Sequence, residues 1–179
     1  MHPIALERRK SEAAKYRDFQ KDGDLVIVDE MGQDVQQVGD IIVKCEEAGL
    51  LDRIGIDPSG IGEIVNESQA RGIEFERVVG ISQGWRLNGA IKTLERRVAE
   101  KTITHGGQAM MTWCVGNARV EPKGNAILIT KQVSGTGKID PLMATLMATA
   151  LMNMNPEPRR VKSRYETETE EQMKEHIAY

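Results

Sequence analysis

The sequence predicts an α/β fold, because segments with helical spacing of apolar residues alternate along the chain with short apolar runs that are typical of strands. The 179 residues are about the length of one domain, and 40% of them are hydrophobic, which is enough to build a core. After Pro156 the chain becomes charged and poor in apolar residues. This change predicts a domain over residues 1–155 and a charged C-terminal tail over residues 156–179.

Charge and composition exclude several classes of protein. Lys and Arg number 24 and Asp and Glu number 27, so the formal net charge is −3 and any contact with DNA requires a local basic patch. The 2 cysteines cannot form a disulfide framework. No apolar run approaches the roughly 20 residues that cross a bilayer, and the start of the chain lacks an apolar signal segment. These features predict a cytoplasmic protein with no membrane partner.

In the first half of the chain, predicted helices have apolar residues three and four positions apart, and predicted strands are short runs of Ile, Val and Leu. Asp-Gly and Pro-Ser-Gly turns separate them. Asp34 stands where it can cap the second helix. We expect helices over residues 4–20, 35–48 and 61–70, and strands over residues 25–28, 54–56 and 77–81.

The second half shows the same alternation and ends in the strongest helical pattern. Two apolar segments flank Pro122-Lys123-Gly124-Asn125, which predicts a hairpin. The residues from Ser134 to Gly137 predict a flexible linker, and the methionines of the last helix are expected to fill the core. We expect helices over residues 88–101, 108–117 and 141–153, and hairpin strands over residues 119–121 and 126–131.

Asp57 is the first candidate functional residue. It stands at the carboxyl end of the predicted strand 54–56, and ligands of open α/β sheets bind at that edge. A partly desolvated carboxylate there suits a hard divalent cation. The same aspartate is also explained as a turn residue whose oxygens accept backbone N–H groups, and the sequence alone favours this structural explanation.

Asp140 is the second candidate, and it precedes Pro141 and the last helix. An aspartate N-cap followed by proline is what helix capping alone would select. The functional interpretation adds that Asp140 shares a cation with Asp57, so we expect both carboxylates at one edge of a sheet. Lys131 and Lys138 are candidates for contacts with a phosphate backbone, although each taken singly is more typical of a solvated lysine.

Other sites find no support in the sequence. The segment Ser134-Gly-Thr-Gly-Lys-Ile is not a P-loop, which would need glycine in place of Gln132 and Ser or Thr in place of Ile139. The 3 histidines have no Cys or His partner at zinc-binding spacing. The chain also lacks the Gly-x-Ser-x-Gly elbow of α/β-hydrolases.

An ordered series of short segments runs along residues 10–152. The segments are Tyr16, Gly23-Asp24-Leu25, Ile54-Gly-Ile-Asp57-Pro, Gly80-Ile-Ser-Gln-Gly84, Lys92-Thr-Leu-Glu95, Lys101-Thr-Ile-Thr-His105, Trp113 to Asn117, Asn125, Lys131 and Lys138-Ile-Asp140. No segment is diagnostic alone, but their order is fairly specific, and the series resembles the C-terminal nuclease region of tailed-bacteriophage terminase large subunits.

The resemblance implies a ribonuclease H-like mixed sheet flanked by helices. It also implies a nuclease that cuts concatemeric phage DNA with two divalent metals, Mg²⁺ or Mn²⁺, held by acidic residues. Asp57 and Asp140 match two of the three family acids, and Lys138 is similar to a basic residue beside the last one. The implied partners are double-stranded DNA, the portal and the small terminase subunit.

The chain departs from the family pattern at its start. The third acid of the family lies in a Gly-x-Asp pattern that would precede residue 1, and the ATPase motor is not found. We therefore expect a fold that is incomplete at the N-terminus, a crippled nuclease site, and a partner that supplies the missing part. The alternatives are a non-catalytic assembly module or prophage remnant that docks to other packaging components, and an unrelated α/β binding protein.

Overall fold

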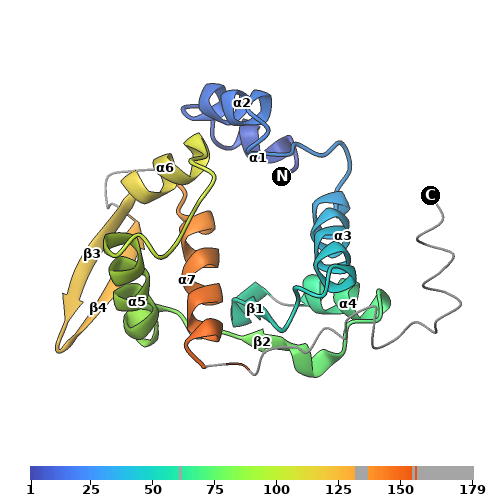
Figure 1. Ribbon diagram of the computed structural model, residues 1–179. Helices are drawn as coiled ribbons and strands as arrows, with labels where there is room; N and C mark the ends of the chain where they lie inside the picture. The colour runs from blue at the N-terminus through green and yellow to red at the C-terminus, as the bar shows by residue number, and fades with distance from the viewer. Residues whose placement is uncertain (61, 132–136, 155, 157–179) are drawn as a thin grey trace, which may run out of the picture.

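The computed structural model describes residues 1–60, 62–131, 137–154 and 156. The predicted linker over residues 134–137 lies outside the described residues except for Gly137, and the predicted tail lies outside them except for Pro156. Helices and strands alternate along the described chain, which confirms the α/β fold (Figure 1). The helices are α1 (Ile4–Glu7), α2 (Ala13–Lys21), α3 (Gln33–Glu47), α4 (Gly62–Ala70), α5 (Asn88–Ala99), α6 (Ala109–Gly116) and α7 (Asp140–Met152). The strands are β1 (Ile54–Ile56), β2 (Val78–Gly80), β3 (Ala118–Lys123) and β4 (Ala126–Lys131).

The described strands form two separate pairs. Strands β1 and β2 are parallel, with Ile54 opposite Val78, and α4 lies in the crossover that a parallel pair requires. Strands β3 and β4 are antiparallel, with Lys123 opposite Ala126. The hairpin is longer than predicted, because Pro122 continues β3, where an edge strand tolerates the missing donor.

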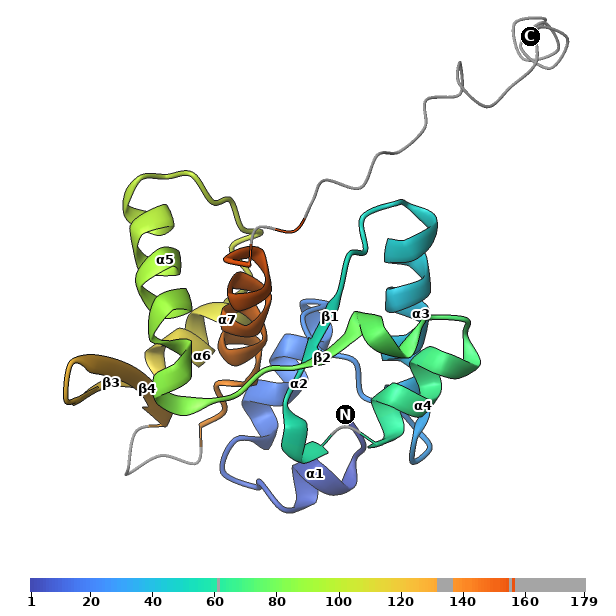
Figure 2. The same cartoon turned by 90° about the horizontal axis from the view of Figure 1, so that it is seen from below.

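Helix α7 lies at the centre of the molecule, between α5 and the hairpin on one side and β1 with α3 and α4 on the other (Figures 1 and 2). Its residues Leu146 and Leu151 belong to the buried core, together with Ile81, Leu87, Ala90 and Ile91. A Cβ added to Gly55 of β1 would lie 3.1 Å from Leu151 Cδ1, so the helix approaches the strand closely. Helix α7 has 13 residues, and no helix in the described part of the chain is long and apolar enough to cross a membrane.

The single helix predicted over residues 4–20 is wrong, because the structure has two helices with a turn between them. The turn spans residues 8–12, where the Arg9 N–H donates to Leu6 O and the Glu12 N–H donates to Arg9 O. These five residues are all polar or charged, so a continuous helix would gain no burial from them. Helix α2 is held instead by Tyr16 and Phe19, whose rings lie 5.8 and 5.6 Å from the ring of Trp113 in α6.

The strand predicted over residues 25–28 is also wrong. Val28 is buried, but its N–H donates to Met1 O, and the Met1 amino group donates to Val26 O. The apolar run therefore has the terminal residue as its backbone partner, and it joins neither of the two described strand pairs.

The two predicted aspartate N-caps, Asp34 and Asp140, are wrong as well. Both residues lie within the first turn of their helices, and the N-cap positions are Gly32 and Ile139. Gly32 has a φ of 85°, which glycine adopts without a steric penalty. Asp140 is instead the acidic residue of the first turn of α7, where its charge interacts favourably with the helix dipole.

Candidate functional site

Asp57 and Asp140 lie on the wall of the same cavity, whose volume is about 400 Å³. Asp57 directly follows β1, Asp140 begins α7, and α7 packs on β1. Lys131, the last residue of β4, lies on the same wall. The other lining residues are Gln83, Ile129, Thr130, Ile139, Met143 and Met147.

The Asp57 carboxylate is held on both of its oxygens. Its Oδ1 accepts the Ser59 N–H at 3.0 Å and the Ser59 hydroxyl at 2.7 Å, and its Oδ2 accepts Gln83 Nε2 at 3.3 Å. The Ser59 N–H and then the Ser59 hydroxyl lower the pKa of Asp57 below its ordinary value. Asp57 therefore forms the expected turn and also presents an ionised carboxylate to the cavity.

Replacing Ser59 by Ala is expected to raise the pKa of Asp57, because the hydroxyl bond to the charged form is lost while the backbone N–H remains. Because the pKa of Asp57 is lowered in the folded state, the Asp57 carboxylate contributes to stability above the unfolded pKa of about 3.9. This contribution is lost as the pH falls through the lower folded pKa. Ser59→Ala is expected to lose part of it. An NMR titration of the Asp57 carboxyl carbon measures the shift. Ser11→Ala is the control, and an unchanged Asp57 midpoint in Ser59→Ala would contradict the assignment.

Gln83 also lies at this site, although the sequence analysis gave it no functional role. Its Nε2 contacts Asp57 Oδ2 and also lies 3.6 Å from Met147 Sδ, so it joins the end of β1 to α7. Ile56 and Gly80 are opposite each other in the parallel pair, and Gln83 follows β2 as Asp57 follows β1. The carboxyl ends of parallel strands meet at one edge of a sheet. The position of Gln83 shortly after a predicted strand was therefore the sequence signal that could have placed it near Asp57.

The segment that leads into α7 is held by Asn117, the residue that follows α6. Asn117 Nδ2 donates to Lys138 O at 3.1 Å, and a Cβ added to Gly137 would overlap Asn117 Cγ. Glycine at position 137 therefore allows the close approach that places Asp140. The Lys138 ammonium lies 3.5 Å from Asp140 Oδ2, so the structure puts this lysine beside the carboxylate.

The donors of this cavity fit a hard divalent cation. Mg²⁺ in proteins is commonly bound by one or two carboxylates, with water and substrate phosphate completing the octahedron, and Mn²⁺ takes similar oxygen ligands. Asp57 and Asp140 supply two such carboxylates. Over the described residues, no group of three or more His, Cys, Asp or Glu side chains could hold a metal. The described donors are therefore two carboxylates, whereas the resemblance implies acidic residues that hold two cations.

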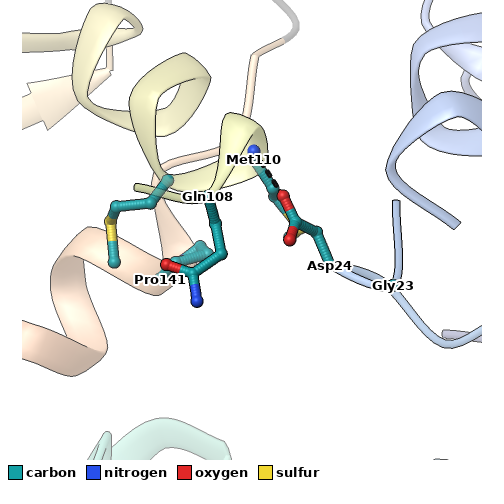
Figure 3. A pocket seen from close by; sticks show the side chains of 6 residues that line it. Gly23, Asp24, Gln108, Met110 and Pro141 are labelled. Carbon is teal, nitrogen blue, oxygen red and sulfur yellow. Dashed lines mark hydrogen bonds between the residues drawn. The ribbon is translucent and has the colours of Figure 1, made fainter. Parts of the chain in front are cut away.

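Asp24 lies in a different cavity and has a different role (Figure 3). Its Oδ2 accepts the Met110 N–H at 3.0 Å, at the start of α6, whose N-cap residue Gln108 makes no side-chain cap bond. A carboxylate at a helix N-terminus satisfies a free donor and interacts favourably with the helix dipole. Asp24 therefore ties the turn after α2 to α6, and the sequence offered no signal for a bond between residues so far apart.

The chain was compared with known proteins. A family model described as "Terminase large subunit, endonuclease domain" matches residues 5–155. Among solved structures, the chain is similar to the crystal structure of the HK97 bacteriophage large terminase, with a TM-score of 0.66 and 23% sequence identity. That match covers 84% of this chain and 32% of the HK97 chain, and at this identity it shows the fold alone. No match was found among curated proteins.

Proposed function

Because this chain belongs to the family of terminase large-subunit endonuclease domains, we propose that it cleaves concatemeric double-stranded phage DNA in a reaction that depends on a divalent metal. The observation that carries the proposal is the cavity shared by Asp57 and Asp140. The proposed setting is DNA packaging in the cytoplasm of the bacterial host. The proposed partners are the portal, the small terminase subunit and the remainder of a large subunit.

The residues of the cavity have distinct proposed roles. Asp57 and Asp140 hold Mg²⁺ or Mn²⁺, and Gln83 positions the Asp57 carboxylate through its bond to Oδ2. A bound metal supplies an activated water and stabilises the negative charge on the leaving oxygen. Lys131 and Lys138 contribute positive charge, Lys131 on the cavity wall and Lys138 beside Asp140, where a DNA phosphate would approach.

The number of carboxylates sets the expected level of activity. Two-metal nucleases use several carboxylates to hold both ions, whereas two acids line the cavity described here. We therefore propose that this chain by itself cleaves DNA weakly or not at all with Mg²⁺, which demands near-ideal octahedral geometry. Mn²⁺ uses the same oxygen ligands and is expected to give the higher activity.

The test is cleavage of supercoiled plasmid by the purified chain with Mg²⁺, with Mn²⁺ and with a chelator. Nicking that occurs with Mn²⁺, is weaker with Mg²⁺ and is absent with the chelator supports the proposal. Cleavage that persists in the chelator would overturn the metal-dependent mechanism. Robust cleavage with Mg²⁺ would overturn the expectation that a site with two carboxylates has low nuclease activity. No cleavage with either metal would favour a non-catalytic assembly module.

A further inference from the structure

A second cavity adjoins the candidate site. Its volume is about 520 Å³, and its described lining comes from α1, the turn after α1, the end of β4 and Gly137 before α7. Lys131 lines this cavity and also the cavity of Asp57 and Asp140. One residue therefore lines both cavities. The other lining residues are Ile4, Ala5, Arg8, Arg9, Ser11 and Gly137.

The two cavities differ in their charged residues. The described lining of the second cavity contains Arg8, Arg9 and Lys131 and no carboxylate, whereas Asp57 and Asp140 lie on the wall of the first. Arg9 Nη1 lies 3.6 Å from Glu12 Oε2, so part of its charge is balanced, while Arg8 and Lys131 are exposed. With a net charge of −3 for the whole chain, this gathering of cations is a local feature and the kind of patch that a polyanion requires.

The break between α1 and α2 creates this arrangement. Arg8 and Arg9 begin the turn over residues 8–12, which the sequence alone places inside a helix. The turn brings both arginines to the same cavity as Lys131 at the end of β4. Guanidinium groups bind phosphate through paired N–H donors, and a lysine ammonium adds a compact positive charge.

We propose that Arg8, Arg9 and Lys131 form a subsite for a backbone phosphate of double-stranded DNA, next to the phosphate that is cleaved. This inference rests on the proposed function, because it takes the cavity of Asp57 and Asp140 as the place of cleavage. A ligand that extends from one cavity into the other contacts Lys131, which lines both. This arrangement suits the consecutive phosphates of a DNA strand better than a single phosphate. The apolar lining residues are Ile4 and Ala5, which offer no aromatic ring for stacking a base.

The test measures binding of a fluorescent DNA duplex to the full chain by anisotropy, in chelator so that cleavage does not interfere. The logarithm of the affinity falls with the logarithm of the salt concentration by about 0.9 for each phosphate contact. Arg8→Gln and Lys131→Gln are each expected to reduce this slope by about 0.9, and the double variant by about twice as much. Lys10→Gln in the same turn and Lys123→Gln at the other end of the hairpin remove the same charge outside the cavity and are expected to leave the slope unchanged.

The outcomes separate the subsite from the proposed function. Reduced slopes confined to Arg8→Gln and Lys131→Gln support the subsite even if the chain does not cleave plasmid, in which case the nuclease proposal alone fails. Equal slopes in all four variants overturn the subsite even if plasmid is cleaved. Absence of binding by the unsubstituted chain also overturns it, as does a strong preference between duplexes of different sequence, since backbone contacts carry no base readout.

Discussion

Replacing Asp57 or Asp140 by Asn is expected to lower metal-dependent cleavage by at least about a hundredfold. Each substitution removes one of the two carboxylates that line the cavity, and a loss of about 3 kcal/mol of charge stabilisation in the transition state corresponds to a factor of about a hundred. Asparagine retains an oxygen that can accept the bonds from Ser59. Asp140 lies in the first turn of α7 and is not its N-cap residue, so neither change is expected to alter the fold.

Plasmid cleavage with Mn²⁺ measures the effect, with thermal unfolding recorded for each variant. Asp29→Asn is the matched control, because Asp29 is an exposed acid outside this cavity. Its cleavage rate is expected to equal that of the unsubstituted chain. If both cavity variants still cut at the original rate, the cavity is not the place of cleavage. Loss of activity in Asp29→Asn would show that a further acid takes part.

Replacing Leu146 by Ala is expected to lower the free energy of unfolding by about 3 kcal/mol, because truncating a buried leucine loses its transfer free energy and leaves a cavity. Leu146 is 2% exposed and lies in the core formed with α5 and β2. The same helix carries Asp140, so a loosened core is also expected to reduce cleavage.

Urea denaturation followed by circular dichroism measures this change. Met152→Ala is the control on the same helix, since Met152 is 55% exposed and its truncation is expected to cost less than about 1 kcal/mol. A loss below about 1 kcal/mol in Leu146→Ala would mean that α7 does not form the centre of the core.

Local patterns in the sequence predicted the elements that position the candidate site. Ile54 and Ile56 indicated the strand that ends at Asp57, and the apolar spacing after Pro141 indicated α7; the structure confirms both elements. Asp57, Asp140 and Lys131 then meet in one cavity. Their functional roles, and that of Lys138, stay predictions until cleavage and binding are measured.

The features that the sequence did not reveal depend on contacts between distant segments. The bond from Met110 to Asp24 joins residues 86 positions apart, and no local pattern encodes such a partner. Val28 has strand-like neighbours but finds its backbone partner at Met1. Helical propensity alone did not locate the turn after α1, because burial of Tyr16 and Phe19 against α6 decides where α2 lies.

The position of α7 near the end of the described chain has a consequence for synthesis on the ribosome. The cavity needs Asp57, Gln83 and Lys131, but it also needs Asp140 and the packing of Leu146. Segments that emerge first can fold first, yet here the residues that pack around α7 leave the ribosome before α7 does. A nascent chain that has not released α7 therefore lacks both Asp140 and the core contacts of Leu146, so the cavity that holds Asp57 is completed only at the end of synthesis.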